Sequence, residues 1–154
     1  MSKSLKVVVF LMGKQQYGIS IDSVLGIEEL HTITKVPNTL DFIKGVINLR
    51  GNITPILDLK QRLQLDETEL VEHTRILIVK MNDLRVGLIV DAATDVMDID
   101  NSVVEHAPEM MNGIKESFLV GVAKLEDSLL ILLDLEHVLD FAEVNEVNEI
   151  IEGN

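Results

Sequence analysis

Short runs of apolar residues, each about as long as a β-strand, alternate with polar breaks along most of this chain. The first two runs lie at 6–12 and 16–21, and Gly13-Lys14 separates them. Apolar runs of strand length that are joined by residues tolerant of positive φ are typical of β-hairpins. The pattern therefore predicts a mostly β protein that is assembled from hairpins.

The hairpin pattern occurs twice. Residues 42–59 align without a gap on residues 118–135, at a shift of 76 positions. An upstream block, which includes the first hairpin, repeats more weakly at a shift of 69 positions. Self-similarity of this kind indicates one supersecondary unit that is used twice. Identical pairs in the longer block include Phe42/Phe118, Gly45/Gly121, Val46/Val122, Leu49/Leu125, Leu57/Leu133, Asp58/Asp134 and Leu59/Leu135, and those upstream are Met12/Met81, Gly18/Gly87 and Asp22/Asp91.

Two equivalent sets of about five short strands predict an all-β fold of two small β-barrel subdomains, each of about five strands and related by the internal repeat. The first subdomain is expected at about 6–64 and the second at about 74–135, and the pattern also allows strands to be exchanged between them. Together they form a single domain over 1–141. Within it, 64–73 is expected to be an exposed linker, and 142–154 follows as an acidic tail.

Polar residues at equivalent positions mark the expected hairpin tips and helix starts. The tips are predicted at Arg50-Gly51 and Glu126-Asp127. Asp58 and Asp134 end their strands, and an aspartate there is a good helix N-cap because its carboxylate accepts hydrogen bonds from the first free amides. The second copy is expected to end in a C-terminal helix, since helical spacing is kept by Leu135, Val138, Leu139 and Ala142.

The composition indicates a soluble protein with an aliphatic core. Apolar residues make up 47% of the 154 residues but aromatic residues only 3%, and there is no cysteine. Neither a disulfide framework nor thiol chemistry is therefore expected. No apolar run approaches the ~20 residues that span a bilayer, and no signal peptide precedes the first strand. The expectation is a cytoplasmic protein without direct membrane insertion.

The net charge of −13 is distributed unevenly. Residues 1–64 carry a charge of +3, whereas residues 65–154 carry −16. Nucleic-acid binding depends on basic residues that neutralise phosphates, and acidic membranes attract the same residues. An acidic chain of this kind is expected to bind neither, and its acidic end is most simply a solvated surface.

The residue patterns that catalysis requires are missing. The four histidines are at least 31 positions apart, which is not metal-ligand spacing, and there is no phosphate-binding or nucleophile motif. Asp58 and Asp134 are the remaining candidates, as a carboxylate pair, but the N-cap role explains them better. The sequence therefore favours a binding module without cofactor or metal over a small enzyme that uses these two aspartates.

The longer repeated block also resembles a known family signature. Its first copy reads Phe42-Ile-Lys-Gly-Val-Ile-Asn-Leu-Arg-Gly-Asn-Ile-Thr-Pro-Ile-Leu-Asp-Leu59, which closely resembles the signature of the CheW-like family of bacterial chemotaxis coupling proteins. The resemblance extends over about residues 5–141, and its most specific part is 45–51. It implies two five-stranded barrels that pack across a shared hydrophobic seam.

The same resemblance implies a function. Members of this family are non-catalytic adaptors that couple methyl-accepting chemoreceptors to the histidine kinase CheA, in signalling arrays at the inner face of the membrane. A CheW-like domain also occurs in CheV-type adaptors, which are the nearest alternative within the family. No cofactor is implied by either form.

The resemblance further implies which residues would meet the receptor. Arg50 matches a family arginine at the hairpin tip, and Gly45 matches a glycine beside the receptor groove. Ala93 and Val96 lie where the family has apolar residues on the other wall of that groove. From the residues alone, Arg50 is more simply a solvated side chain and Gly45 a site of close backbone packing, whereas the resemblance implies that Arg50 binds the receptor or ties the subdomains together.

The resemblance also implies a second set of residues, which would contact the kinase. Val24 and Ile27 match a strand whose apolar residues meet the regulatory domain of CheA, although barrel core explains them equally well. One departure lies on this strand: where the family commonly has a glutamate, this chain has Gly26, and Glu28 and Glu29 follow it. If that glutamate pairs with the tip arginine, the pairing here has to be different or absent.

Overall fold

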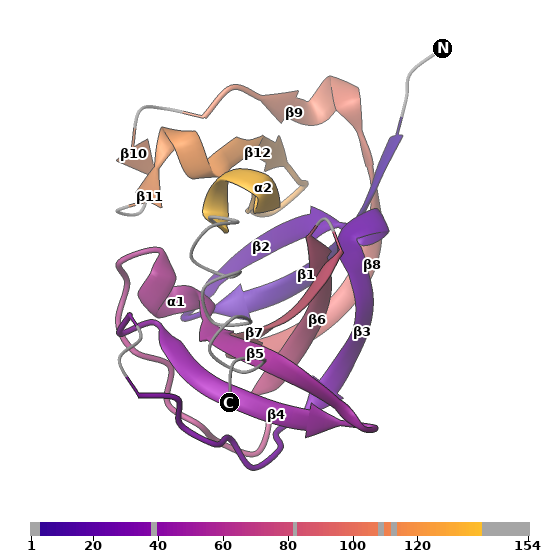
Figure 1. Ribbon diagram of the computed structural model, residues 1–154. Helices are drawn as coiled ribbons and strands as arrows, with labels where there is room; N and C mark the ends of the chain where they lie inside the picture. Colours follow the sequence, from indigo (N-terminus) through magenta and orange to yellow (C-terminus); the bar gives the residue numbers. More distant parts are fainter. Residues whose placement is uncertain (1–3, 38–39, 82, 108–109, 112–113, 140–154) are drawn as a thin grey trace.

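The protein is mostly β-structure (Figure 1), and the computed structural model describes residues 4–37, 40–81, 83–107, 110–111 and 114–139. The strands are β1 (Ser4–Met12), β2 (Gln15–Ser20), β3 (Val24–Glu29), β4 (Ile43–Leu49), β5 (Asn52–Asp58), β6 (Arg75–Met81), β7 (Leu84–Val90), β8 (Ala92–Asp100), β9 (Val104–Glu105), β10 (Met110–Met111), β11 (Ile114–Lys115), β12 (Leu119–Lys124) and β13 (Leu129–Leu133). The helical elements are short: α1 (Leu59–Arg62), α2 (Leu135–Val138) and the 3₁₀ turns η1 (Ile21–Ser23), η2 (Asn101–Val103) and η3 (Glu116–Phe118).

Two large sheets contain most of the strands. The five-stranded sheet has the order β3-β6-β7-β5-β4, and the six-stranded sheet has the order β8-β1-β2-β13-β12-β9. Each sheet contains a hairpin from the other copy of the repeat: β6–β7 lies within the first copy's sheet, and β1–β2 lies within the second copy's sheet. The sheets therefore interleave the two copies by strand exchange, and they do not follow the sequence boundaries 6–64 and 74–135.

The internal repeat is preserved in the strand register. Gly45 lies opposite Ile56 in the β4–β5 hairpin, and Gly121 lies opposite Leu132 in the β12–β13 hairpin, which is the shift of 76 seen in the sequence. Both ladders also change register just before the glycine. The exchanged hairpins enter at equivalent places, because Gly87 lies beside Ile56 and Gly18 beside Leu132. The two halves are therefore related residue by residue.

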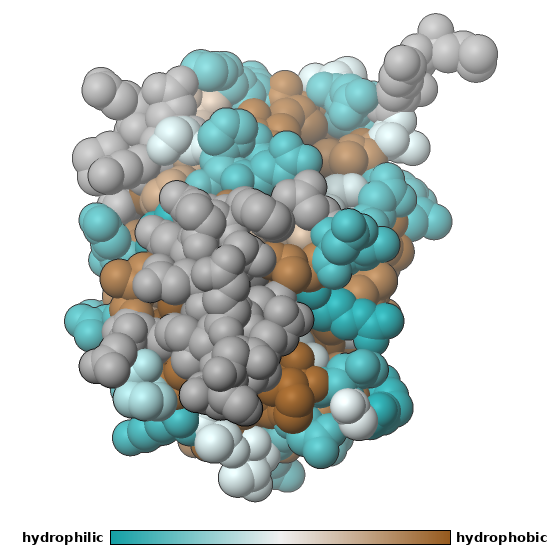
Figure 2. Space-filling view, viewed as in Figure 1, coloured by the Kyte–Doolittle hydropathy of each residue, from teal (hydrophilic) through white to brown (hydrophobic). Residues whose placement is uncertain are grey.

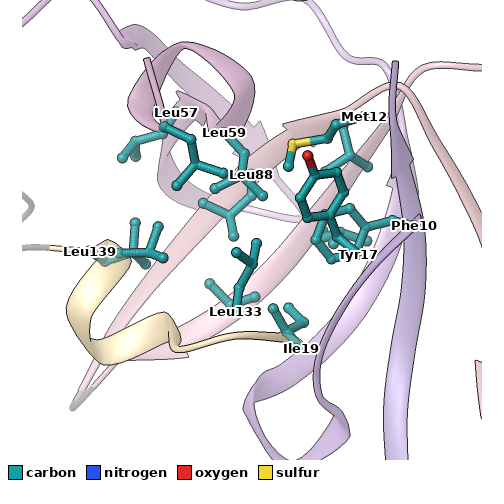
Figure 3. Close-up of a cluster of buried hydrophobic side chains, with 14 of the residues drawn as sticks. Phe10, Met12, Tyr17, Ile19, Leu57, Leu59, Leu88, Leu133 and Leu139 are labelled. Carbon is teal, nitrogen blue, oxygen red and sulfur yellow. The ribbon is translucent and has the colours of Figure 1, made fainter. Parts of the chain in front are cut away.

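The largest hydrophobic cluster, called the seam below, takes side chains from both sheets (Figure 3). Phe10 and Tyr17 stack there with ring centroids 6.1 Å apart. Because burying each large apolar side chain contributes roughly 1.5–3 kcal/mol, the seam dominates the stability of the fold. Its buried members are Val8, Phe10, Met12, Tyr17, Ile19, Ile43, Leu57, Leu59, Leu63, Leu77, Val79, Met81, Val86, Leu88, Val90, Ile114, Ile131, Leu133, Val138 and Leu139.

Each sheet also has a smaller core of its own. In the five-stranded sheet it includes Ile47, Ile56 and Ile76, and in the six-stranded sheet it includes Val9 and Leu132. The all-β class and the two-subdomain arrangement that the sequence predicted are thus confirmed. One sheet has six strands because the two-residue β9 pairs with β12, and its counterpart in the other half is the single bridge from Thr34 to Val46.

Two local expectations need detail. Most residues of 64–73 are exposed, as predicted, but Thr68 is buried and hydrogen-bonds to Asp58, which fixes the segment against the end of β5. The C-terminal helix is described only as α2, since Ala142 and the tail 142–154 lie outside the described residues. In the described part of the chain, no helix has the length and apolar character to cross a membrane.

Candidate partner-binding surfaces

Arg50 lies in a two-residue turn between β4 and β5. The ladder closes at the pair Leu49–Asn52, so only Arg50 and Gly51 remain in the loop. Their φ angles are 51° and 89°, as in the type I′ turns that join tight hairpins. An arginine with a left-handed backbone costs about 1–2 kcal/mol, and such strain is concentrated at functional sites. The turn therefore does not explain the arginine, whereas a role for its side chain does.

The Arg50 guanidinium pairs with Glu28 on β3. Its Nη1 and Nη2 both donate to Glu28 Oε1, at 3.0 and 2.7 Å. Gly26, where the family commonly has a glutamate, is two residues earlier and on the same side of β3, since alternate residues of a strand share a side. Glu28 thus supplies the carboxylate two residues further along β3. The Arg50 side chain remains 73% exposed, so its outer surface is open to a partner.

Gly45 is buried and has a packing role. Its φ is +141°, and a Cβ built there would overlap the carbonyl oxygen of Thr34 and lie 2.7 Å from its carbonyl carbon. The segment at Thr34 runs beside β4 at this point, and two hydrogen bonds of 2.8 Å hold it there, from Thr34 N to Val46 O and from Val46 N to Thr34 O. Gly121 has the same surroundings, because its Cβ would lie 2.7 Å from the carbonyl oxygen of Glu105. Close backbone approach therefore accounts for this pair of identical glycines.

The four apolar candidates form two equivalent pairs. Val24 corresponds to Ala93, and Ile27 corresponds to Val96, at the upstream shift of 69 positions. β3 and β8, which carry them, are both edge strands of their sheets. Val24 and Ala93 are half-buried and pack against the seam. Ile27 and Val96 are each 46% exposed, so they are the members that can contact a partner directly.

The structure distributes the receptor candidates over both sheets. Gly45 and Arg50 belong to the five-stranded sheet, whereas Ala93 and Val96 lie on the edge of the six-stranded sheet. The hydrogen bonds of the Arg50 guanidinium tie it to β3, the strand that carries the kinase candidates. A single surface that contains all four receptor candidates therefore has to extend from one sheet to the other, past the edge of the seam between them.

Some exposed apolar residues were missed in the sequence. Leu25, beside Val24 on β3, is 50% exposed. Alternation along β3 indicates that only one of these two neighbours can face the core, and this signal was available in the sequence. Ile53 and Leu129, which are equivalent at the shift of 76, are also exposed on their hairpins. Figure 2 shows apolar areas on one face of the molecule, separated by hydrophilic residues.

A cavity of about 470 Å³ lies beside the buried Asp58. Asp58 accepts hydrogen bonds from Thr68 N at 2.8 Å, from Thr68 Oγ1 at 2.7 Å and from Gln61 N at 3.4 Å. The last of these confirms the predicted N-cap of α1. Its carboxylate is thus occupied in holding the chain. The cavity is lined by Leu30, His31, Ile33, Lys35, Lys44, Asp58, Glu67, Thr68, Leu70 and Ile89.

Asp134 does not act as a side-chain cap, so that part of the prediction is wrong. Its Oδ2 lies 2.7 Å from Nδ1 of His137 instead. Asp58 and Asp134 end strands of different sheets, and each has its own partners, so nothing in these contacts supports a shared carboxylate pair. Burial raises the pKa of the Tyr17 hydroxyl above its ordinary value. Among the described residues, no group of three His, Cys, Asp or Glu is placed to hold a metal ion.

Comparison with known proteins places the chain in a family. A family model described as a CheW-like domain matches residues 6–143. The chain is 41% identical over 135 residues to the chemotaxis protein CheW of Bacillus subtilis (strain 168), which covers 88% of this chain and 86% of that protein. It is 32% identical over 133 residues to the chemotaxis protein CheV3 of Helicobacter pylori, which covers 84% of this chain and 43% of CheV3.

A solved structure agrees with these matches. The scaffolding protein TtCheW from Thermoanaerobacter tengcongensis superimposes with a TM-score of 0.81 at 35% sequence identity, and the match covers 92% of this chain and 91% of that one. The chain therefore shares the fold of that protein. The chain is a member of the CheW-like family.

Proposed function

We propose that this chain is a non-catalytic chemotaxis adaptor that couples chemoreceptors to the histidine kinase CheA. It would act in the cytoplasm, at receptor arrays on the inner face of the membrane. The names of its relatives, chemotaxis protein CheW and scaffolding protein TtCheW, support a scaffold role in chemotaxis. The similarity to CheV3 keeps a CheV-type adaptor as the second candidate.

The observation that carries the proposal is the pair of equivalent edge strands. β3 and β8 belong to different sheets, and at equivalent positions they present Ile27 and Val96, each 46% exposed. Such side chains lose contact with water when a partner covers them, which contributes about 25 cal/mol per Å² before the costs of association. One chain thus offers two similar surfaces, as an adaptor between two partners needs.

The kinase is assigned to β3 in this proposal. Ile27 and Leu25 are exposed there, and Val24 supports them from the seam side. A regulatory domain with a similar apolar surface could pack against them and bury aliphatic area. The acidic neighbour Glu29 is also exposed and would lie at the polar rim of that contact.

The receptor is assigned to β8 and the β4–β5 tip. Val96 is exposed, Ala93 packs behind it, and the exposed Arg50 guanidinium adds a cationic group. Gly45 contributes by letting the chain cross close to β4 rather than by touching the partner. Apolar positions with a few polar groups suit an amphipathic helix, which is the expected form of the receptor tip.

The test compares Ile27→Asp with Val96→Asp. The two residues are equivalent in the repeat and equally exposed, so both substitutions should leave the fold equally intact. Each places an unpaired charge in an apolar contact if its strand is covered by a partner. Binding to the CheA regulatory domain and to a receptor cytoplasmic tip is measured by calorimetry for both variants. Leu129→Asp is the control, because Leu129 is 41% exposed on β13 and lies in neither proposed surface.

Ile27→Asp should weaken binding to the kinase by tenfold or more, about 1.4 kcal/mol, and leave receptor binding unchanged. Val96→Asp should have the opposite effect, and Leu129→Asp should affect neither partner. If both variants weaken receptor binding alone, β3 and β8 bind one partner together and the assignment of the kinase to β3 is wrong. If neither partner binds the unchanged protein, the adaptor proposal itself fails.

A further inference from the structure

Arg62, the last residue of α1, makes three contacts that belong to neither proposed partner surface. Its guanidinium carbon lies 5.2 Å from the ring centroid of Phe42 and 5.2 Å from that of Phe118. Both distances are within the range of a cation–π interaction. Phe42 and Phe118 are the identical first residues of the two copies of the longer block. One arginine therefore contacts the same residue of both halves at equal distance.

A third contact of Arg62 also joins the halves. Its Nε donates to the carbonyl oxygen of Val138, at 2.7 Å. Val138 is the equivalent of Arg62 at the shift of 76, and it is fully buried at the end of α2. Since Arg62 contacts its own counterpart and both phenylalanines, it lies where the two halves meet symmetrically. Only one copy can place a side chain there, which accounts for an arginine in one half and a valine in the other.

The two phenylalanines connect Arg62 to the sheets. Asp58 N donates to Phe42 O, and Asp134 N donates to Phe118 O, both at 2.8 Å. Each phenylalanine is thus bound to the end of β5 or β13, and both pack against the seam. The seam is mostly apolar, and hydrophobic attraction is non-directional. The planar guanidinium, by contrast, has defined directions for both rings and for the carbonyl.

We infer that Arg62 is a positioning residue that sets the orientation of the two sheets, and through it the geometry between the two partner surfaces. In Figure 1, α1 lies at the left and α2 in the upper middle of the molecule, whereas β3 and β8 lie at the right. Arg62 thus acts from the α1–α2 side and stays outside both proposed surfaces. The second half of this inference rests on the proposed adaptor function, whereas the first half does not.

The first experiment measures the orientation directly. The chain has no cysteine, so Lys80→Cys on β6 of the five-stranded sheet and Asp127→Cys in the β12–β13 loop of the six-stranded sheet introduce two exposed spin labels. The distance between the labels is measured by pulsed electron paramagnetic resonance in three proteins: one with the native Arg62, one with Arg62→Met and one with Arg62→Lys. Arg62→Met should broaden or shift the distance distribution. Arg62→Lys keeps the charge, and it should restore the mean distance but not the full width, because an ammonium cannot lie flat against both rings.

The control separates orientation from stability. Ile78→Val removes one methylene from the core of the five-stranded sheet and should lower the melting temperature without changing the distance distribution. If Arg62→Met lowers the melting temperature but leaves the distribution unchanged, Arg62 is only a stabilising contact and the inference is wrong.

The second experiment concerns the two partners. Arg62→Met should leave the affinity for each partner alone unchanged, because each surface remains intact, and should reduce formation of the complex with both partners by about fivefold or more. If the distribution broadens but the complex of three components forms normally, sheet orientation does not control assembly. That result would remove the second half of the inference and leave the adaptor function untouched.

Discussion

Replacing Gly45 by alanine is expected to destabilise the fold without touching a partner. The new Cβ would overlap the carbonyl oxygen of Thr34, which is a backbone atom and cannot rotate away. The φ of +141° also lies in a region that only glycine adopts readily. Alanine therefore forces either the strand β4 or the segment at Thr34 to move.

The magnitude follows from these two effects. Backbone strain in a glycine-only region costs about 1–3 kcal/mol. If the segment at Thr34 moves away, its two hydrogen bonds to Val46 are weakened, and each contributes about 0.5–1.5 kcal/mol. A loss of about 3 kcal/mol or more in unfolding free energy is expected, which corresponds to a fall of about 6–12 °C in melting temperature for a chain of this size.

Thermal and urea unfolding measure this loss, and Gly26→Ala is the matched control. Gly26 lies in β3, and a Cβ built there meets no atom within 4 Å, so its replacement should change stability by less than about 1 kcal/mol. If Gly45→Ala instead unfolds like the unchanged protein and loses receptor binding, Gly45 is a contact residue. The packing explanation would then be refuted.

Two further substitutions test other parts of the structure. Arg50→Gly removes an exposed ion pair but relieves the left-handed turn, so urea unfolding should show a change of less than about 1 kcal/mol, while binding to the receptor tip weakens; a large stability loss would mean that Arg50 mainly holds the subdomain together. Asp58→Asn should cost about 1–3 kcal/mol in thermal unfolding, because an amide nitrogen cannot accept the hydrogen bonds of Thr68. Asp134→Asn, at a partly exposed site without a cap, should cost less than about 0.5 kcal/mol, and equal losses at both positions would contradict this difference.

Much of the fold was predictable because the repeat is a physical constraint. Identical residues such as Gly18 and Gly87 mark places where the neighbouring chain comes close: a Cβ on Gly18 would lie 3.2 Å from Leu132 Cδ2, and one on Gly87 would overlap Ile56 Cδ1. Leu132 and Ile56 are themselves equivalent in the repeat. A repeated glycine thus predicts a repeated close contact, although it does not reveal which strand makes it.

The hydrophobic pattern of the sequence allowed the strand exchange but did not determine it. Hairpin β1–β2 has equivalent partners in either half, because the residues that pack against Gly18 and Gly87 are equivalent and similar in size. The segment 64–73 is likewise anchored through Thr68 to Asp58, which its polar composition did not indicate. The sequence did contain a signal for the pairing of Arg50 with Glu28, because positions 26 and 28 share one side of β3.

Under the proposed adaptor function, duplication gives one chain two partner surfaces, but it also sets a limit. If the halves were identical, both edge strands would present the same surface and neither partner could be distinguished from the other. The differences between equivalent positions therefore have to carry the selectivity: Arg50 against Glu126 at the two hairpin tips, and Ile27 against Val96 on the two edges. Charge reversal at the tips is the larger of these, because a buried or partner-facing charge of the wrong sign costs more than a change of one methylene. Because only the proposed receptor surface includes a tip, selectivity between the partners should depend more on Arg50 than on the apolar strands.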